Sequence, residues 1–506
     1  MHKLQEYIDV LTKNNLLSSD NTNADDKEII IKGLTYDSNS VTEGTLFVCK
    51  GAAFKQAYLE DAVKKGAVAF ISEKEYPDVA LPHIMVNDIR RAMPFLGKIF
   101  YDSPWNNFKL TGLTGTKGKS TTAYYIKNIL DLYEESIGRS ETAITSSIDF
   151  YDGKKRYESH ITTPECLELL YHFDNAAKSD IDFFTMEVSS QALKYNRVDL
   201  ITYDAGVFLN ISEDHISPIE HPDFEDYFSS KLRFFSQVKH ALICTDSDYY
   251  ERIEEASKAS SKVTTFGTKP GSDIYGYDIK KVDEEIHFKV KCDRFDKEFI
   301  LTMPGLFNVQ NALAAIAVAV SYDIPEEYIF NGLKTARSKG RMELFTTKDK
   351  KVFAIVDYAH NKLSFEKLYE STFSEYPGRR VVTIFGCPGK KALLRREHLG
   401  TLAGKNSDMI YLVPEDPGEE PAEEISKDIA QYVEKEGCPY EILDSRSIAI
   451  KKAIFEVASP DMPPTVLLIT GKGDETRQKI GREYIPCPSD AEYVQNFIKE
   501  YDEKYN

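Results

Sequence analysis

The amino-acid sequence predicts an α/β protein with three domains, and three observations lead to this fold class. The chain has 506 residues, a length that suggests about three domains of ordinary size. Short apolar runs typical of strands alternate with helical patterns along the chain. A glycine-rich stretch stands between one such strand and the helix that follows. We therefore expect domains at residues 1–106, 107–338 and 339–506, each large enough to bury a core of its own.

The first segment is a small α/β unit. Strand-like runs begin at Thr45, Ala67 and His83, and a helical pattern covers residues 58–65. The polar, proline-containing stretch 101–108 is expected to be the linker to the next domain.

The second segment opens with the sequence LTGLTGTKGKSTT at residues 110–122. Residues 108–113 have a strand pattern, and apolar residues recur at helical spacing from Ala123 to Tyr133. Further strands are expected to end at Val188, Ile211 and Thr245. The glycine-rich loop is therefore expected between a strand and the start of a helix, in a domain with a mostly parallel sheet.

The third segment has four strand-like runs, which alternate with helical patterns. This alternation predicts a Rossmann-like, doubly wound sheet, in which ligands bind beyond the carboxyl ends of the strands. Polar clusters follow all four runs, so we expect a binding site there. The clusters are DYAHN, GCPGKK, PEDPGEE and GKGDE.

Composition excludes several classes of protein. With 42% hydrophobic and 28% charged residues, the chain has a globular composition. The net charge of -18 argues against general attraction to nucleic acids or membranes, which are anionic. The seven cysteines are scattered, and no signal-peptide pattern or bilayer-length apolar run is present. We expect a cytoplasmic monomer with no nucleic-acid partner and no membrane insertion.

The glycine-rich loop fits a nucleotide-binding pattern in part. A P-loop reads G-x-x-x-x-G-K-[ST]; its N–H groups cradle phosphates, its lysine reaches the terminal phosphates and its hydroxyl ligates Mg²⁺. Gly118, Lys119 and Ser120 fit, whereas Leu113 replaces the first glycine. The order of strand, turn and helix start suits a phosphate. Nucleotide binding is favoured over the alternative of a purely structural turn.

The stretch TGTKGKST at residues 114–121 resembles the Mur ligase superfamily, and the resemblance extends over nearly the whole chain. Residues 36–67 are most similar to its MurE branch, in particular to the lysine-adding form. The further motifs that carry the resemblance are ITTPE (161–165), MEVSSQ (186–191), LNISEDH (209–215), YFSSKLRFF (227–235), GLFNVQN (305–311), GRME (340–343), DYAHN (357–361) and GKGDE (471–475).

The resemblance implies an ATP-dependent amide-bond ligase of peptidoglycan precursor synthesis. Its substrates would be ATP, UDP-N-acetylmuramoyl-L-alanyl-D-glutamate and an amino acid, with Mg²⁺ as cofactor. The N-terminal domain would bind uridine, the central P-loop-type domain ATP, and the C-terminal Rossmann-like domain the amino acid. A carboxylate would be phosphorylated and then attacked by the amine, while the protein positions groups and neutralises charge.

The resemblance also assigns metal and ATP residues. From the residues alone, Glu187 is an acid near a helix start, His215 a loop histidine and Lys231 an exposed helix lysine. By family position these three ligate Mg²⁺ together with Ser120, and Lys231 does so as a carbamate. The catalytic residues that the resemblance implies are Lys119, Lys231, Glu187 and His215. The ATP site comprises Gly115, Thr116, Lys117, Gly118, Lys119, Ser120, Thr121, Asn308, Asn311, Arg341, Asp357 and His360, of which the last three require domain closure.

For the nucleotide-sugar peptide, the family uses the serine of a D-S-R motif at the uridine end. This chain keeps Ser38 but has Asn39 in place of the arginine. The remaining substrate contacts implied by the resemblance are Thr162, Thr163, Ser189 and Arg197; from the sequence alone, Arg197 would be a surface arginine.

The added amino acid is expected to be L-lysine. Diaminopimelate-adding relatives read D-N-P-R, and the arginine pairs with the distal carboxylate of that substrate, whereas this chain has Asp416, Pro417 and Gly418. A charge-assisted hydrogen bond is worth about 1.5 to 3 kcal/mol, or roughly ten- to a hundredfold. The nearby acids Glu415 and Glu419 favour a cationic side chain, although from the sequence alone they are acids of a solvated loop. The resemblance assigns Lys391, Asp416, Gly418, Gly471 and Glu475 to the amino-acid site.

Several alternatives remain at this stage. The amino acid could be ornithine or diaminopimelate, and lysine-adding relatives usually read D-D-P-N rather than the E-D-P-G found here. A folylpolyglutamate synthase lacks the uridine-binding domain that residues 36–67 suggest, and a paralogue could act on a lipid-linked precursor. A non-catalytic regulator would bind nucleotide or UDP-peptide without turnover, but the retained Lys119, Glu187 and Lys231 argue against it.

Overall fold

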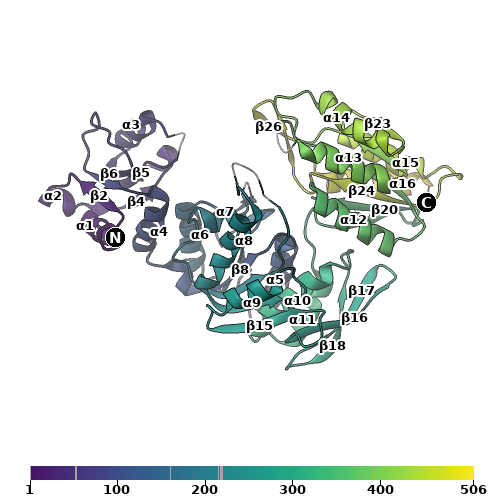
Figure 1. The fold of residues 1–506 in the computed structure, drawn as a ribbon, viewed down its shortest axis with the longest axis horizontal. Helices are drawn as coiled ribbons and strands as arrows, with labels where there is room; N and C mark the ends of the chain where they lie inside the picture. Colours follow the sequence, from purple (N-terminus) through teal and green to yellow (C-terminus); the bar gives the residue numbers. More distant parts are fainter. Residues whose placement is uncertain are drawn as a thin grey trace. The chain divides into compact units, whose positions relative to one another are not determined.

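The computed structural model describes residues 2–51, 54–159, 161–214, 216, 220–390 and 393–505. The chain forms two compact units (Figure 1). The first unit comprises Met1–Tyr275 and Leu313–Ile329, and the second comprises Gly276–Ala312 and Phe330–Asn506. No helix in the described ranges is long and apolar enough to cross a membrane.

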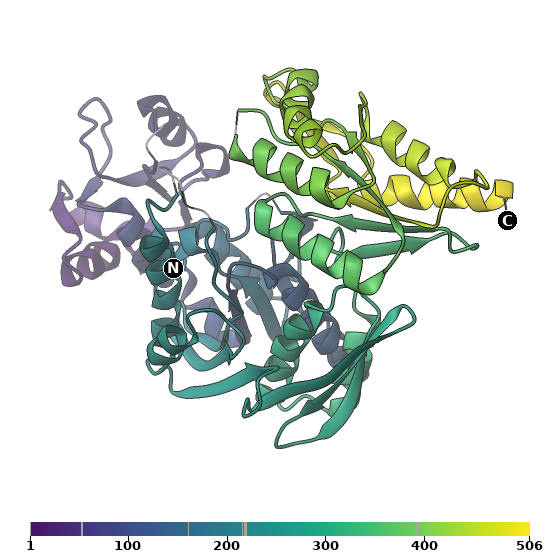
Figure 2. The ribbon, with the colours of Figure 1, turned by 45° about the vertical axis from the view of Figure 1, so that its right-hand side comes forward.

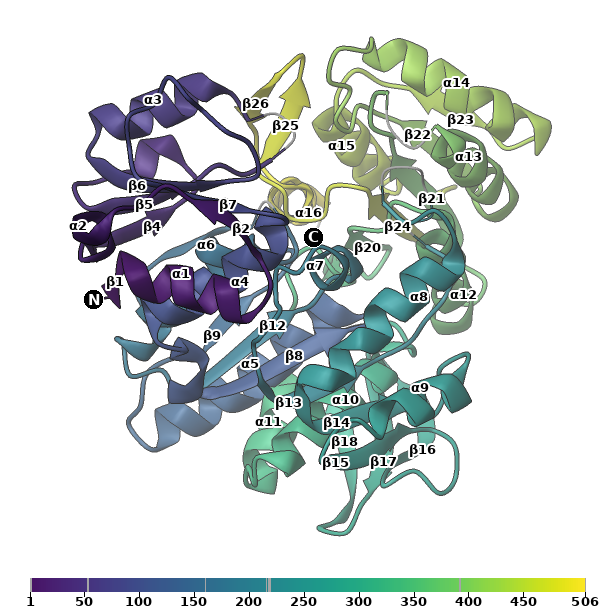
Figure 3. The same cartoon turned by 60° about the vertical axis from the view of Figure 1, so that its left-hand side comes forward.

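The N-terminal part of the first unit is a five-stranded sheet with the order β2-β7-β6-β5-β4. All its pairs are parallel except β2 with β7. Helices α1 and α4 pack on one face and α3 on the other (Figure 3). The elements are β1 (His2–Lys3), α1 (Leu4–Lys13), β2 (Leu17–Asp20), α2 (Ala24–Lys27), β3 (Ile30–Ile31), β4 (Gly33–Thr35), η1 (Ser38–Ser40), β5 (Thr45–Val48), α3 (Gln56–Lys64), β6 (Ala67–Ser72), β7 (His83–Val86) and α4 (Ile89–Tyr101).

The central sheet of the first unit has the order β11-β10-β9-β12-β8-β13-β14-β15. From β9 to β15 all neighbouring strands are parallel, and β10 is antiparallel to both its neighbours. The elements are β8 (Lys109–Thr114), α5 (Lys119–Ser136), β9 (Ala143–Thr145), β10 (Asp149–Tyr151), β11 (Arg156–Glu158), α6 (Cys166–Ala177), β12 (Phe183–Glu187), α7 (Ser190–Lys194), β13 (Tyr203–Phe208), α8 (Phe224–Leu232), η3 (Arg233–Gln237), β14 (Val238–Cys244), α9 (Tyr250–Ser257) and β15 (Lys262–Gly267). The mostly parallel sheet and the strand before the glycine-rich loop confirm the sequence prediction.

One apolar core joins the two sheets of the first unit, because α4 packs against α6. Gly97 makes this approach possible: a Cβ atom there would lie 2.4 Å from Cδ1 of Leu170. The stretch expected to be a linker takes part in the same core. It contains the short helix η2 (Pro104–Asn107), and Trp105 is buried. The stretch connects α4 to β8, but it is packed rather than exposed, because the large apolar indole outweighs its polar neighbours.

The second unit begins with three long strands that lie side by side (Figure 2). They are β16 (Ile274–Val282), β17 (Glu285–Lys291) and β18 (Asp296–Leu301), and β17 and β18 are antiparallel. The sequence analysis did not single out these strands. The chain passes between the two units within β16, α10 (Asn308–Ser321) and α11 (Glu326–Thr335).

The C-terminal sheet confirms the doubly wound prediction. Its order is β19-β20-β24-β21-β22-β23, with only β19 antiparallel. Helices α12–α14 cover one face and α15 and α16 the other (Figure 3). The elements are β19 (Glu343–Thr346), β20 (Val352–Asp357), α12 (Lys362–Glu375), β21 (Arg380–Phe385), α13 (Leu394–Asn406), β22 (Met409–Leu412), α14 (Ala422–Lys435), β23 (Tyr440–Ile442), α15 (Arg446–Glu456), β24 (Thr465–Thr470), β25 (Arg477–Ile480), β26 (Glu483–Pro486) and α16 (Asp490–Tyr505). The four polar clusters follow the carboxyl ends of β20, β21, β22 and β24.

Candidate active site

The glycine-rich loop joins β8 to α5, as the sequence predicted, and two glycines shape it. Gly115 has φ +150°, and a Cβ atom there would lie 3.0 Å from Cβ of Leu209. Gly118 precedes α5 with φ +85°, in the left-handed region that favours glycine. The loop therefore presents the N-terminus of α5, where backbone N–H groups attract anions.

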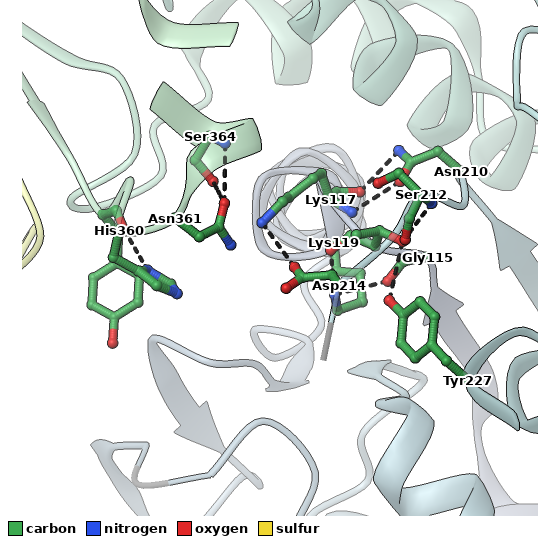
Figure 4. A network of polar contacts seen from close by, with 12 residues as sticks. Gly115, Lys117, Lys119, Asn210, Ser212, Asp214, Tyr227, His360, Asn361 and Ser364 are labelled. Carbon is green, nitrogen blue, oxygen red and sulfur yellow. Dashed lines mark hydrogen bonds and ion pairs between the residues drawn. The ribbon is translucent and has the colours of Figure 1, made fainter. Parts of the chain in front are cut away.

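The segment after β13 braces this loop from one side (Figure 4). The Asn210 side chain accepts from the Lys117 N–H at 2.9 Å and donates to the Lys117 carbonyl at 3.1 Å. The Thr116 N–H donates to the Asn210 carbonyl at 3.0 Å, and the Thr116 hydroxyl pairs with the Tyr227 hydroxyl at 3.0 Å. Asp214 forms an ion pair of 3.2 Å with Lys117. The loop conformation is thus fixed from outside.

Two lysine side chains converge on one carbonyl of the loop. Nζ of Lys119 donates to the Gly115 carbonyl at 3.0 Å, and Nζ of Lys231, from α8, donates to the same oxygen at 2.9 Å. This arrangement places the Lys119 cation and further N–H donors at the N-terminus of α5, where anionic phosphates bind favourably.

Lys231 differs from the exposed helix lysine that its sequence context suggested. Its residue is only 2% exposed, and it lies over the Tyr227 ring at 4.9 Å. Burial and then the charge of Lys119 hold the pKa of Lys231 well below its usual 10.5. The position of α8 against the loop causes this burial, so the sequence of α8 alone does not reveal it.

A polar network around Glu187 brings together several predicted site residues. Glu187 is 1% exposed and ends β12. Its carboxylate accepts from the Ser147 N–H at 2.8 Å and from the Ser147 hydroxyl at 3.2 Å. Ser147 also contacts the Thr162 hydroxyl at 3.2 Å. The Thr163 hydroxyl donates to the Glu187 carbonyl at 2.9 Å and lies 3.3 Å from the Ser189 hydroxyl.

Arg197 belongs to the same region, and its side chain is 12% exposed rather than on the surface. It donates to the Thr163 carbonyl at 3.2 Å and forms a 2.9 Å ion pair with Glu165, which also pairs with Lys50. Its Nε is buried and has no hydrogen-bond partner among the described residues. Ser38 lies apart in η1, where its carbonyl accepts from Lys65 at 3.0 Å.

The second unit contains the other predicted ATP residues. The Asp357 carboxylate accepts from the Met342 N–H at 2.8 Å and from the Ala359 N–H at 2.7 Å. The Arg341 guanidinium lies 4.5 Å from the centre of the Tyr358 ring. Nδ1 of His360 lies 2.8 Å from the Tyr358 carbonyl.

Asn308 and Asn311 lie buried at the start of α10. The Asn308 side chain donates to the Pro304 carbonyl at 2.6 Å, and the Asn311 side chain donates to Oδ1 of Asn308 at 2.9 Å. The two amides therefore hold one another, in addition to any role toward a ligand.

The predicted amino-acid residues meet at the ends of β22 and β24, and Lys472 joins them. Its Nζ lies 2.9 Å from Oδ1 of Asp416 and 2.5 Å from Oε2 of Glu475. Gly471 has φ +101°, and a Cβ atom there would lie 3.0 Å from Oε2 of Glu415.

Glu415 is 9% exposed, so the expectation that these acids are solvated was wrong for this one. Burial raises the pKa of Glu415 to about 7. Glu419, by contrast, is half-exposed and pairs with Arg482 at 2.9 Å. The loop thus combines a buried acid with surface ones.

Two predicted residues, His215 and Lys391, lie outside the described residues. Within the described ranges, no group of three or more His, Cys, Asp and Glu side chains has an arrangement suited to a metal ion.

Comparison with known proteins decides the family. Residues 113–319 match the Mur ligase middle domain, and residues 340–473 match the Mur ligase, glutamate ligase domain. The chain is 36% identical over 476 residues to UDP-N-acetylmuramoyl-L-alanyl-D-glutamate--L-lysine ligase of Enterococcus faecalis, with 92% of both chains covered. The chain belongs to the Mur ligase family.

Two further comparisons extend over nearly the whole of this Mur ligase. It is 33% identical to UDP-N-acetylmuramoyl-L-alanyl-D-glutamate--L-lysine ligase of Streptococcus pneumoniae, over 98% of this chain and 100% of that one. A solved structure of UDP-N-acetylmuramoyl-L-alanyl-D-glutamate--2,6-diaminopimelate ligase has the same fold, with a TM-score of 0.66, 22% identity and 99% of both chains covered.

The residues of this Mur ligase fit a nucleotide with Mg²⁺. Gly115 and Gly118 provide the backbone conformations of a phosphate cradle, and Lys119 supplies a cation at its edge. Glu187 and the Ser120 hydroxyl offer the hard oxygen atoms that Mg²⁺ prefers. The hydrogen bonds to the Glu187 carboxylate come from Ser147, which is neutral. Its negative charge also acts on Lys231, whose charged form it favours.

The residues that hold the site together were not predicted from the sequence. Asn210 and Asp214 lie in the quoted motif LNISEDH, but their contacts with Lys117 cross 93 and 97 positions of sequence. Lys472 lies in the quoted motif GKGDE. Its position in a polar cluster directly after a strand, as in the three other clusters of the third segment, was the signal that could have identified it. Ser147 has no such signal, since it lies in an irregular segment between β9 and β10.

Proposed function

We propose that this Mur ligase joins L-lysine to the D-glutamate carboxyl group of UDP-N-acetylmuramoyl-L-alanyl-D-glutamate, with cleavage of ATP, in peptidoglycan precursor synthesis. The observation that carries the ATP-dependent step is the convergence of Lys119 and Lys231 on the Gly115 carbonyl at the N-terminus of α5. The substrates follow the names of the two L-lysine ligases that this chain resembles.

In this proposal, the loop Gly115–Thr121 binds the ATP phosphates through its N–H groups. The Lys119 ammonium neutralises the charge that develops as the terminal phosphoryl group moves to the D-glutamate carboxylate. The amino group of lysine then attacks the acyl phosphate; its C–N bond forms as the bond to phosphate breaks and the nitrogen loses a proton. Further contributors to the ATP site are Asn308, Asn311, Arg341, Asp357 and His360.

Mg²⁺, when bound, neutralises phosphate charge, and the residues that would hold it are Ser120, Glu187, His215 and Lys231. We include Lys231 as a carbamate. Its low pKa favours the neutral amine, which is the form that attacks CO2 with loss of a proton. The carbamate is anionic, so the repulsion between Lys231 and Lys119 would become an attraction.

The nucleotide-sugar peptide is bound, in this proposal, along the first unit. Ser38 contacts the uridine end, while Thr162, Thr163, Ser189 and Arg197 contact the remaining portions. The buried, unpartnered Nε of Arg197 supports this role, because buried donors in proteins are normally satisfied. Residues 1–106, 107–338 and 339–506 remain our division into uridine-binding, ATP-binding and amino-acid-binding domains.

The amino acid is bound at the end of the C-terminal sheet by Lys391, Asp416, Gly418, Gly471 and Glu475. The absence of an arginine after Pro417 and the acids around Asp416 support L-lysine over diaminopimelate. Ornithine, with the same terminal ammonium, is the second candidate for the same reason.

The experiment is an amino-acid panel assayed with the UDP-dipeptide and ATP. Phosphate release should require both the UDP-dipeptide and L-lysine, and mass spectrometry should detect the UDP-dipeptide extended by one lysyl residue. Preference for diaminopimelate would refute the assigned amino acid. ATP hydrolysis that ignores both substrates would favour a regulatory protein, and glutamate addition to a folate would favour a folylpolyglutamate synthase.

A further inference from the structure

Lys472 places an internal ammonium group between two carboxylates of the amino-acid site. Its side chain is only 5% exposed, and its Nζ lies 2.9 Å from Asp416 and 2.5 Å from Glu475. Burial opposes the positive charge, but the carboxylates of Glu475 and Asp416 outweigh burial and raise the pKa of Lys472. The ammonium therefore stays charged throughout the physiological pH range.

Asp416 is held through one of its two oxygen atoms. Oδ1 accepts from Lys472 and also from the Lys479 N–H at 3.0 Å. The β25–β26 hairpin keeps that N–H in place: the Gly418 N–H donates to the Lys479 carbonyl at 3.1 Å, and the Gly481 N–H to the Gly418 carbonyl at 2.7 Å. No hydrogen bond to Oδ2 of Asp416 comes from the described part of the chain, so this oxygen is available to a ligand.

Glu475 is held through both of its oxygen atoms. Oε2 pairs with Lys472, and Oε1 accepts from the Tyr358 hydroxyl at 3.0 Å. The cluster of Asp416, Lys472 and Glu475 therefore has two negative charges and one positive charge. Counted over these three side chains, the net charge is about one negative unit. More of it is left on Asp416, because Lys472 lies closer to Glu475 (2.5 Å) than to Asp416 (2.9 Å).

We propose that Lys472 is a positioning residue that determines specificity: by tethering Asp416 and Glu475, it leaves a single oriented carboxylate oxygen, Oδ2 of Asp416, for the side-chain ammonium of the added amino acid. This inference rests on the proposed function, because it concerns the same amino-acid site.

The charge balance explains the selection of one chemical class. A single ammonium at the end of an aliphatic chain compensates the one remaining negative charge. The distal centre of diaminopimelate has an ammonium and a carboxylate, so it compensates no charge and brings its carboxylate near Asp416. Without Lys472, the two carboxylates would repel each other, and Asp416 would keep only one of the two donors that orient it, the Lys479 N–H.

The test is the variant Lys472→Met, which keeps most of the length of the side chain and removes its charge. We expect KM for L-lysine to rise about ten- to a hundredfold, the equivalent of one charge-assisted hydrogen bond. KM for ATP and for the UDP-dipeptide should change less than about twofold. Inhibition by L-norleucine, which has the α-amino and α-carboxyl groups but no side-chain ammonium, should be unchanged. Lys451→Met is the matched control, since Lys451 pairs with Glu500 on the surface of the same unit.

A second set of variants separates positioning from simple loss of structure. In the double variant with Asp416→Asn, the two substitutions should cost little more than one alone, because both weaken the same contact between Asp416 and the substrate ammonium. Lys472→Arg keeps a cation between the carboxylates, so it should restore KM for L-lysine to within about tenfold of wild type; it carries the test if Lys472→Met does not fold.

Three outcomes overturn the inference: an unchanged KM for L-lysine in Lys472→Met, an equal rise in KM for all three substrates, or weaker inhibition by L-norleucine. A folded Lys472→Arg protein as impaired as Lys472→Met also contradicts it. If the wild-type protein forms no lysyl product, the proposed function fails instead, a result visible before any variant is made.

Discussion

Lys231 and Lys472 are two buried lysines with opposite electrostatic surroundings. Both residues are nearly inaccessible, at 2% and 4% exposure. Lys231 donates to a neutral carbonyl, and burial and the charge of Lys119 outweigh the charges of Asp214 and Glu187. Lys472, in contrast, lies between the carboxylates of Asp416 and Glu475. The pKa of Lys231 is lowered and that of Lys472 is raised.

Burial alone does not determine the protonation state of a lysine in this protein. Desolvation favours the neutral amine in both places, and the partner groups decide the protonation state. The lowered pKa of Lys231 favours the neutral amine, which is the nucleophilic form that the proposed carbamate requires. Lys472 is a permanent cation that orders its neighbours.

The largest effect is expected for Lys119→Ala, which removes the cation beside Lys231. The charge that develops on the transferred phosphoryl group loses its nearest compensation, so kcat should fall about 100- to 1000-fold. Phosphate release and formation of the UDP-tripeptide measure the loss. Lys109→Ala, at the exposed start of β8, is the control. A normal rate in Lys119→Ala would contradict the proposed phosphate site.

The two lysines should also affect the pH dependence of stability differently. Between the lowered pKa of Lys231 and 10.5, the unfolded chain binds one proton more than the folded protein. Stability therefore rises with pH in this interval, by up to about 1.4 kcal/mol per pH unit. Urea unfolding in CO2-free buffer at about pH 7 and pH 9 measures this effect. The unfolding free energy of wild type minus that of Lys231→Met should be larger at about pH 9 than at about pH 7.

For the corresponding variant Lys472→Met, we expect no such change of relative stability with pH. The raised pKa of Lys472 means that its contribution to stability is fully present below 10.5 and is lost only above that value. The difference in unfolding free energy between wild type and Lys472→Met should therefore be the same at about pH 7 and pH 9. Parallel pH curves for both variants would refute the distinction between the two lysines.

The two variants should also lose different amounts of unfolding free energy. Lys472→Met leaves two partly buried carboxylates without their cation, which should cost about 2 kcal/mol of unfolding free energy. Lys231→Met removes one hydrogen bond from a lysine whose charged form is disfavoured, so its cost should be smaller, about 1 kcal/mol or less. Thermal and urea unfolding measure both, and a larger loss for Lys231→Met would contradict the assignment.

The smallest effect is expected for Tyr358→Phe. Its hydroxyl donates to Glu475, and water should replace part of this bond, since the Glu475 side chain is 27% exposed. KM for L-lysine should rise about fivefold, equivalent to about 1 kcal/mol. Tyr493→Phe, on α16, is the control. An unchanged KM would show that Lys472 alone positions Glu475.

Much of the fold could be predicted from the sequence, because local patterns determine it. The strand, glycine loop and helix around Lys119 are consecutive, and the four buried strands of the C-terminal sheet are strongly apolar. The roles of Lys231 and Lys472 could not be predicted from the residues. Each lysine acquires its surroundings from segments far away: Lys231 bonds a carbonyl 116 positions earlier, and Lys472 pairs with a residue 56 positions earlier.

The contact of α4 with α6 at Gly97 has a consequence for the range of substrates. Since the two sheets of the first unit share one core, the separation between Ser38 and Thr162 is fixed by packed side chains rather than by a flexible connection. A nucleotide-sugar peptide that touches both ends must have the matching length. If Ser38 and Thr162 contact the substrate as proposed, the first unit would reject shortened or extended analogues before any chemistry begins.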